Sequence, residues 1–228
     1  MSDAPKGLAL LREVFINRRV AIMIPLGAAS GLPLILTGKT LSAWMASVDV
    51  DLTTIGLFAF AGLAYNLKFL WAPLLDRFRL PLLGRRRGWI LATQLLVIAG
   101  LVWMSGIDPA ATPLAMALAA MFLSFVSASQ DIVVDAYRTD VLSPRERAAG
   151  VAIFVTSYRV AMIAAGAGAL ILSDHVSWRL VYLCMAGLMG IGVVGVLLAP
   201  RTESPADAPR TLGRAVWAPL SEFIGRAN

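Results

Sequence analysis

The chain has 228 residues, of which 58% are hydrophobic and only 15% are charged. A soluble domain of this length would carry about a quarter charged residues, so the composition excludes an ordinary soluble fold. The net charge of +6 does not indicate nucleic-acid binding, because the basic residues stand between apolar runs and form no basic face with stacking aromatic residues.

Six apolar runs reach the length of about 20 residues that a helix needs to cross the core of a bilayer. In lipid every backbone amide needs an internal partner, so we predict transmembrane α-helices. In chain order they occupy residues 20–40, 52–72, 88–107, 113–135, 149–172 and 178–199. The predicted fold class is an all-α membrane protein, with an N-terminal arm at 1–19, a six-helix bundle at 20–199 and a tail at 200–228.

The basic residues predict the orientation of this bundle. They gather in every second connection, whereas the other connections are acidic or neutral apart from Arg179. Cytoplasmic loops carry the excess of lysine and arginine, so we expect both termini in the cytoplasm. The basic positions are Lys6, Arg12, Arg18, Arg19, Arg77, Arg79, Arg85, Arg86, Arg87, Arg138, Arg145, Arg147, Arg201, Arg210, Arg214 and Arg226.

A glycine pair marks the first predicted helix, where Gly27 and Gly31 have GxxxG spacing. Such pairs bring membrane helices close together. They also leave room for a bulky ligand, but we favour close helix packing.

The sequence offers no pattern for a cofactor, a metal or covalent catalysis. Cys184 is the single cysteine, and His175 is the single histidine and has no companion ligands. Neither a nucleotide-binding loop nor a serine-nucleophile elbow is present. We therefore expect no cofactor, no metal site and no enzyme activity.

The connection between the second and third helices carries the first informative motif. Asp76 and Arg77 end the second helix, and Gly84 precedes a basic group that opens the third. A carboxylate here can accept hydrogen bonds from arginines or from an exposed helix N-terminus, and such a latch would stabilise one conformation. The alternative is a basic loop with one incidental acid. The latch candidates are Asp76, Arg77, Gly84, Arg85, Arg86 and Arg87.

Several segments resemble the AmpG muropeptide permeases of the major facilitator superfamily. They are residues 30–34 (SGLPL), 68–77 (KFLWAPLLDR), 84–89 (GRRRGW) and 127–140 (SASQDIVVDAYRTD), with shorter matches at 146–147, 158–159 and 218–223. The resemblance implies a facilitator that imports anhydro-muropeptides across the bacterial inner membrane, driven by protons. The imported cargo serves peptidoglycan recycling and supplies the signal for β-lactamase induction.

The length departs from that family, whose members have at least twelve helices. We read the chain as an amino-terminal half, in which residues 200–228 are a linker leading to a missing second half and residues 211–224 lie at the membrane interface. Two six-helix halves normally rock around a central site. The chain is therefore expected to need a second half or a copy of itself as a partner.

Ionisable residues inside the predicted helices are candidates for function, because placing a charge in a bilayer costs about 2.5–3.5 kcal/mol on insertion scales. Asp131 and Asp135 share a helix face and are the proton-coupling candidates. Arg159 falls near the midplane and is the candidate ligand for a substrate carboxylate. Asp131 and Arg159 can instead form a permanent ion pair, while Lys39 is expected to snorkel. The remaining substrate-binding candidates are Gln130, Tyr158, Lys68 and Trp44.

The function therefore has three open interpretations. The first is muropeptide transport, and the second is transport of another solute such as acetyl-coenzyme A. The third is a transport-inactive fragment that serves as a membrane interaction module.

Overall fold

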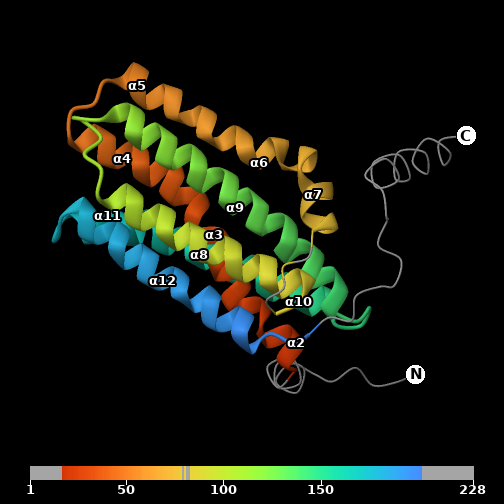
Figure 1. Ribbon diagram of the computed structural model, residues 1–228. Coiled ribbons are helices and arrows are strands. Elements are labelled where there is room, and N and C mark those ends of the chain that lie inside the picture. The colour runs from red at the N-terminus through yellow and green to blue at the C-terminus, as the bar shows by residue number, and fades with distance from the viewer. Residues whose placement is uncertain (1–16, 79, 81–82, 202–228) are drawn as a thin grey trace, which may run out of the picture.

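The computed structural model describes residues 17–78, 80 and 83–201, and in these residues the chain is helical without any β-strand (Figure 1). Six stretches are long and apolar enough to cross a membrane. They are Arg18–Ser47, Leu52–Leu70, Arg86–Ser105, Pro113–Val141, Arg147–Ser173 and Trp178–Leu198. This result confirms the predicted all-α architecture with six spans.

Several spans consist of more than one helical element. The first span contains α2 (Arg18–Ala21), α3 (Met23–Thr37) and α4 (Lys39–Ser47). The second contains α5 (Leu52–Leu57), η1 (Phe58–Gly62), α6 (Leu63–Leu67) and η2 (Lys68–Leu70), and α7 (Ala72–Arg77) follows it. The third and fourth are single helices, α8 (Arg85–Ser105) and α9 (Pro113–Val141). The fifth contains α10 (Arg147–Ile163), the π-helical turn η3 (Ala164–Gly168) and α11 (Ala169–Ser173), and the sixth is α12 (Trp178–Leu198).

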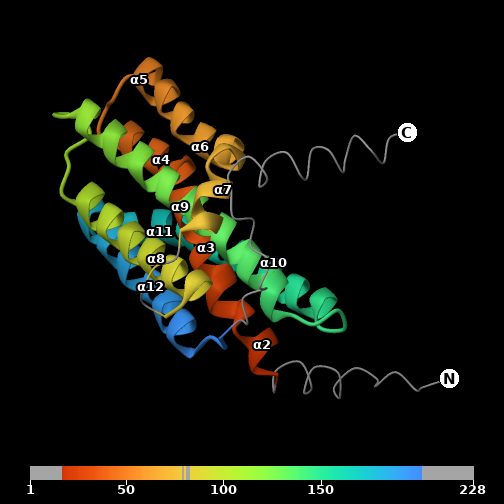
Figure 2. The same cartoon turned by 45° about the vertical axis from the view of Figure 1, so that its right-hand side comes forward.

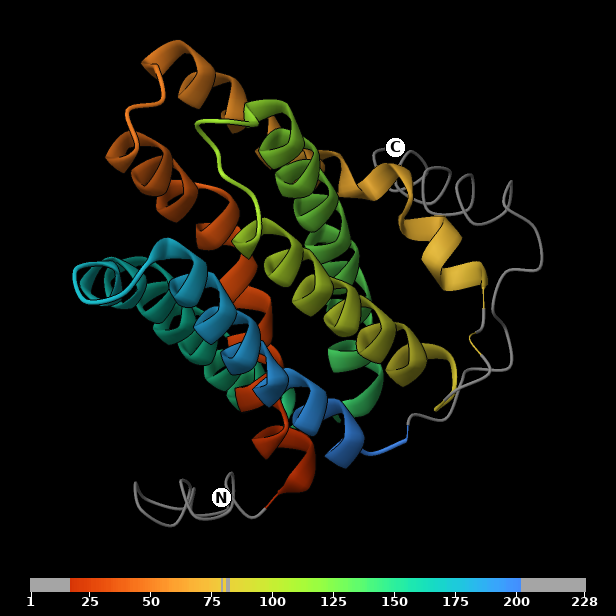
Figure 3. The same cartoon turned by 60° about the vertical axis from the view of Figure 1, so that its left-hand side comes forward.

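Two predicted boundaries are wrong. The first helix was expected over residues 20–40, but α4 continues it to Ser47 after a change of direction at Gly38 (Figure 3). Beyond this break the Thr40 hydroxyl is buried and donates to the carbonyl of Ala165, 2.7 Å away in the π-helical turn. The fourth helix likewise runs to Val141 and does not end at residue 135.

Helices α3 and α9 occupy the middle of the bundle. Helix α10 packs against α3, while α8 and α12 pack against each other and against this central pair. The second span lies on the flank of the bundle beside α9 (Figures 1 and 2). It is largely exposed along its length, as is the fifth span.

The glycine pair on α3 explains the close approach of α10. A Cβ atom at Gly27 would collide with the carbonyl oxygen of Phe154, and one at Gly31 would collide with that of Tyr158. Both obstacles are backbone atoms, which cannot rotate away as the end of a flexible side chain can. The structure thus confirms that this GxxxG pair serves helix packing.

A layer of polar side chains divides the apolar core. One hydrophobic cluster contains Leu32, Leu101, Leu123 and Met189, and the other contains Leu26, Ile90, Val134 and Val196. Ser30, Thr93, Gln94, Ser127 and Gln130 are buried at sequence positions between these two sets on α3, α8 and α9. The polar layer therefore crosses the middle of the membrane-spanning bundle.

The first and last described residues lie at the same end of the bundle. The Arg18 guanidinium donates two hydrogen bonds, of 2.9 and 2.7 Å, to the carbonyl of Leu198. The buried Arg87 guanidinium donates to the carbonyls of Val196 and Leu197. The Tyr137 hydroxyl donates to the carbonyl of Pro200 at 3.0 Å. The bonds to Leu197 and Leu198 satisfy carbonyls that the end of α12 leaves without intrahelical partners. The predicted arm, apart from residues 17–19, and the predicted linker and interfacial segment beyond residue 201 lie outside the described residues.

Glu146 joins the start of α10 to the start of the first span. Its Oε2 accepts the Ser143 backbone N–H at 2.8 Å, and its Oε1 accepts a hydrogen bond from the Asn17 side chain. The Ser143 amide, and after it the Asn17 amide, hold the pKa of Glu146 below its usual value of 4.5 because they stabilise the ionised carboxylate. The ionised Glu146 side chain therefore connects the start of α10 with Asn17 at this end of the bundle.

Candidate functional site

Polar side chains from four spans meet on the side of α9 that faces α3, the second span and α10. We call this group the intramembrane cluster, and the interactions among its members define it. Its members are Ser30, Thr37, Tyr65, Lys68, Ser127, Asp131, Asp135 and Tyr158. Three of the predicted substrate-binding or coupling residues therefore lie together with Asp131, and the cluster is the candidate transport site.

Asp131 is the central acid of this cluster. It lies on α9 one helical turn after Ser127 and one turn before Asp135, so the three side chains share one face. Ser30 reaches it from α3, and Lys68 supplies the strongest cationic influence on it from the second span. A carboxyl group in this setting can exchange a proton against the pull of a neighbouring ammonium group.

Asp135 has a different environment from Asp131. Its Oδ1 forms an ion pair of 3.0 Å with the guanidinium of Arg138, one turn further along the same helix. The Arg138 guanidinium also lies 4.7 Å above the centre of the Phe154 ring on α10, a cation–π contact. Asp135 thus helps to tie α9 to α10, which leaves Asp131 as the acid that faces Lys68.

The structure does not bring Arg159 to Asp131. In the described part of the chain Arg159 forms no ion pair, and it is exposed on α10. The preceding residue, Tyr158, faces α3, and a helix turns by about 100° per residue, so Arg159 points away from that contact. The permanent ion pair between Asp131 and Arg159 that the sequence allowed is therefore absent among the described residues. Lys68 is the basic side chain that acts on Asp131 electrostatically, without an ion pair within 4.0 Å.

Gln130 points into the bundle core and not toward the cluster. It is fully buried, as is Gln94 on α8, and neither amide has a hydrogen-bond partner among the described residues. A Cβ atom at Gly192 on α12 would lie 2.6 Å from the Gln94 side-chain nitrogen. The two glutamines belong to the polar layer between the hydrophobic clusters, and among the described residues no hydrogen bond joins Gln130 to the charged candidates.

The two aromatic candidates lie at different levels. Tyr158 is half-buried beside Phe154, at 6.4 Å between ring centres, and belongs to the cluster. Trp44 is only 5% exposed and stacks on Trp178 at 5.9 Å, with Tyr182 at 4.9 Å. Because these two rings cover Trp44, the structure places it in an aromatic group on α4 and α12, outside the cluster.

The predicted latch centres on Arg86. Its guanidinium donates to Asp76 at the end of α7 and, at 2.9 Å, to Asp140 near the end of α9. Gly84 precedes α8 with a φ of +83°, a conformation that favours glycine. Arg77 is exposed and forms no ion pair among the described residues, whereas Arg87 binds carbonyls of α12 and Arg85 begins α8. The sequence prediction did not include Asp140, the second acid of this bridge.

Sequence reasoning also missed Tyr65. Its hydroxyl is buried between Ser127 and Thr37, close to the charge of Asp131. A signal was available, because Tyr65 precedes Lys68 by three residues and so shares its side of the second helix. The sequence analysis selected Tyr158 among the polar residues of the apolar runs but did not select Tyr65.

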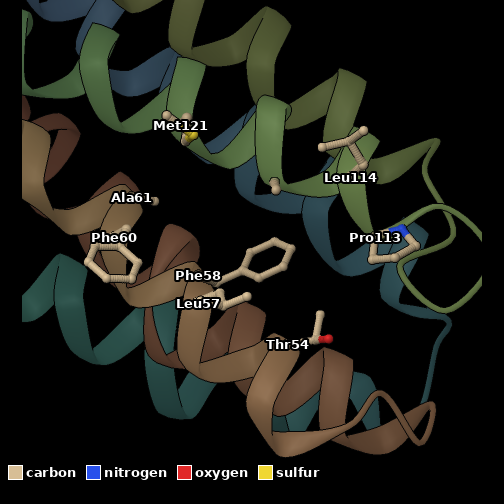
Figure 4. A pocket seen from close by; sticks show the side chains of 9 residues that line it. Thr54, Leu57, Phe58, Phe60, Ala61, Pro113, Leu114 and Met121 are labelled. Carbon is tan, nitrogen blue, oxygen red and sulfur yellow. The ribbon is translucent and has the colours of Figure 1, made fainter.

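An apolar groove on the flank offers no comparable chemistry. It lies between the second span and the start of α9, has a volume of about 270 Å³ and includes the ring of Phe58 (Figure 4). Thr54 is the single polar residue in its lining. Nor do the described residues contain a group of three or more histidine, cysteine or acidic side chains placed to hold a metal.

Comparison with known proteins agrees with this architecture. Residues 27–228 match the family model described as the Major Facilitator Superfamily. The chain is 48% identical over 217 residues to the anhydromuropeptide permease of Escherichia coli K12, a match that covers 95% of the chain and 44% of that protein. It is 31% identical over 227 residues to the putative transporter AmpG 4 of Rickettsia felis, covering 95% of the chain and 55% of the relative. The chain thus spans about half the length of these curated relatives. The matches confirm the resemblance read from its motifs. It belongs to the major facilitator superfamily, whose members are transporters and not enzymes.

Proposed function

We propose that this chain provides one side of a proton-coupled carrier that imports anhydro-muropeptides across the bacterial inner membrane. The imported cargo would serve peptidoglycan recycling and β-lactamase induction. The observation that carries the proposal is the placement of Asp131 on α9 within the electrostatic influence of Lys68 from the second span, inside the membrane-spanning bundle. The similarity to an anhydromuropeptide permease supports the choice of substrate.

The chemistry of Asp131 and Lys68 supports a coupling between proton and substrate movement. When Asp131 is ionised, it attracts the Lys68 ammonium group. When Asp131 takes up a proton, that attraction ends and Lys68 is free to bind a carboxylate of the peptide part of the substrate. Tyr158 adds a hydroxyl at the same level, and the exposed Arg159 next to it offers a second cation. Substrate binding and protonation therefore favour each other.

The exposed faces of the second and fifth spans support a partner within the membrane. Both spans carry large apolar side chains that no described residue covers, among them Phe60, Phe69, Val160 and Ile163. Lipid covers such surfaces, or other helices do. In the proposed carrier, a second set of helices or a second copy of the chain closes the transport path on this side.

We also propose that the end of the bundle that holds residues 17 and 201 faces the cytoplasm. The basic residues Arg86, Arg138 and Arg147 lie toward that end, in agreement with the usual distribution of charge around membrane helices. A membrane-impermeant maleimide tests this orientation in a Cys184→Ala background. Arg145→Cys should react only after the cells are permeabilised, whereas Asp108→Cys should react in intact cells. The opposite pattern would refute the orientation.

Transport is best tested in a chimera. The matching 217-residue segment of the E. coli permease is replaced by this chain, and uptake of radiolabelled anhydro-muropeptide is measured in cells that lack their own permease. The chimera should restore uptake that a protonophore abolishes. In parallel, the 228-residue chain is expressed alone in the same cells.

Matched substitutions then address the coupling site. Asp131→Asn should lower uptake at least tenfold and remove its dependence on external pH, because the amide cannot exchange a proton. The control is Asp174→Asn, which removes an exposed acid from the connection before α12 and should leave uptake unchanged. A chimera that reaches the membrane without transporting muropeptide would refute the proposed choice of substrate. Unchanged pH-dependent uptake by Asp131→Asn would refute the coupling role.

A further inference from the structure

A cavity of a different kind lies at the end of the bundle opposite α2, where α4 ends and α12 begins (Figure 1). We call it the aromatic cavity, and its lining includes Trp44, Ser105, Asp108, Ser177, Trp178 and Arg179. Its volume of about 430 Å³ falls within the range of ordinary small-molecule sites, about 300–1,000 Å³. Unlike the groove on the flank, this cavity combines aromatic rings with charged and hydroxyl-bearing side chains.

Hydrogen bonds and stacking fix two tryptophan rings at the wall of the aromatic cavity. The Trp178 indole N–H donates to the Ser47 hydroxyl at 2.8 Å, and that hydroxyl donates to the carbonyl of Trp44 at 2.7 Å. The two rings stack with 5.9 Å between their centres and 14° between their planes. Trp178 is only half-buried, so it presents a flat apolar surface whose orientation is already set. A ligand that packs on it therefore loses little free energy in ordering the ring.

Two side chains of opposite charge border the same cavity. Asp108 and Arg179 are both exposed, and neither forms an ion pair among the described residues. One oxygen of Asp108 accepts the backbone N–H groups of Ala110 at 2.9 Å and Ala111 at 3.3 Å, so its other oxygen can accept from a ligand. A carboxylate only accepts hydrogen bonds, whereas a guanidinium only donates them. The two together suit a ligand whose polar groups both donate and accept.

This combination matches the chemistry of a sugar ring. A pyranose has an apolar face of C–H groups and a rim of hydroxyl groups, so an aromatic ring can cover the face while charged side chains bind the rim. A simple anion would gain from Arg179 but would be repelled by Asp108. Arg179 also stands in a connection of the otherwise acidic or neutral set, so the distribution of charge around membrane helices does not account for it.

Anchoring at the membrane interface accounts for a third tryptophan at this end of the bundle but not for Trp44. Interfacial tryptophans present their rings to the lipid head groups. Trp103, at the end of α8, is 48% exposed and can do so. Trp44 is only 5% exposed and lies behind Trp178. The stacked pair therefore builds the wall of a cavity.

We propose that the aromatic cavity binds a sugar ring of the imported substrate. The inference rests on the proposed function, because an anhydro-muropeptide consists of amino sugars joined to a peptide. In the proposed orientation, this end of the bundle faces the side from which imported cargo arrives. Trp178 packs against the ring, while Asp108 and Arg179 bind its polar substituents.

Binding is measured on the purified 228-residue chain by isothermal titration calorimetry, in a detergent that has no sugar head group. The probe is the disaccharide of the anhydro-muropeptide without its peptide, so that binding of peptide carboxylates elsewhere does not contribute. The disaccharide should bind saturably. Asp108→Asn and Arg179→Gln should each weaken its binding at least about tenfold, because a hydrogen bond to a charged group is weakened or lost.

Exposed residues outside the aromatic cavity supply matched controls. Asp174→Asn and Arg201→Gln remove the same two charges elsewhere on the surface and should leave the disaccharide affinity unchanged. Trp178→Ala should abolish binding, whereas Trp103→Ala should not. Circular dichroism checks that each variant is folded, and the two exposed charged residues decide the outcome if Trp178→Ala unfolds the chain.

Failure of this inference and failure of the proposed function give different results. The sugar site is refuted if the chimera transports anhydro-muropeptide but the purified chain does not bind the disaccharide, and the proposed function then stands. Equal binding by the wild type and the Asp108 and Arg179 variants refutes the site as well. If the disaccharide binds through both side chains but the chimera transports no muropeptide, the sugar site stands and the proposed function fails.

Discussion

The bridge formed by Arg86 makes a quantitative prediction about which of its two acids stabilises the bundle. The Arg86 and Asp140 side chains are 11% and 19% exposed and are joined by a bond of 2.9 Å, whereas the Asp76 side chain is 50% exposed. Hydrogen bonds of charged groups contribute about 1.5–3 kcal/mol when they are shielded from water. Exposed ion pairs typically contribute 0–1 kcal/mol. Asp140 should therefore be the stronger partner, with a coupling energy to Arg86 of about 2 kcal/mol.

Double-mutant cycles on the purified chain measure these couplings directly. The variants are Arg86→Gln combined with Asp140→Asn in one cycle and with Asp76→Asn in the other. The free energy of unfolding is followed by circular dichroism during denaturation in detergent micelles. A coupling to Asp76 that equals or exceeds the coupling to Asp140 would refute the argument from exposure. A cycle between Arg77→Gln and Asp76→Asn is the control and should show no coupling.

Three further predictions concern packing, pH and the end of α12. Gly31→Ala should destabilise the bundle by about 1–3 kcal/mol through overpacking against α10. The control is Gly187→Ala, whose added Cβ atom would meet nothing within 4 Å and should not destabilise the bundle. Thermal unfolding distinguishes the two variants. The lowered pKa of Glu146 means that its bonds stabilise the folded chain above the unfolded-state pKa, and this contribution is lost as the pH falls through the still lower folded-state pKa. Glu146→Gln should therefore flatten the acid side of the stability–pH curve below about pH 4.5, and an unchanged acid limb would contradict the assignment. Arg87→Leu should destabilise the chain by about 2–3 kcal/mol, because one buried and one partly buried hydrogen bond to carbonyls of α12 are lost. Limited proteolysis after residue 196 should become faster.

Much of the fold was predictable from the sequence, because the requirement for internal hydrogen bonding in lipid depends only on the length and polarity of each segment. The six spans and the role of Gly27 and Gly31 in packing follow from this local information. The first span was predicted to end at residue 40, but α4 extends it to Ser47. Only the packed bundle reveals that the Thr40 hydroxyl finds a partner in the π-helical turn of another span.

The sequence predicted several residues of the candidate site but not the contacts among them. Asp131, Lys68 and Tyr158 are conspicuous because polar groups are costly within apolar helices, and α-helical periodicity places Asp131 and Asp135 on one face. The sequence allowed Arg159 to reach Asp131, despite an offset in depth of about 8 Å, because a short loop joins their helices as an antiparallel hairpin. Depth along a helix does not specify rotation about its axis, and the rotation of α10 directs Tyr158 toward α3 and exposes Arg159.

The sequence by itself determined that the chain spans a membrane six times, because hydropathy and chain length are properties of each segment alone. The tertiary structure decided which polar groups meet: Lys68 rather than Arg159 beside Asp131, Asp140 as a second acid on Arg86, and the Tyr65 hydroxyl beside Ser127. These pairings depend on the rotation and tilt of helices packed against one another, and side chains distant in the sequence set that packing together.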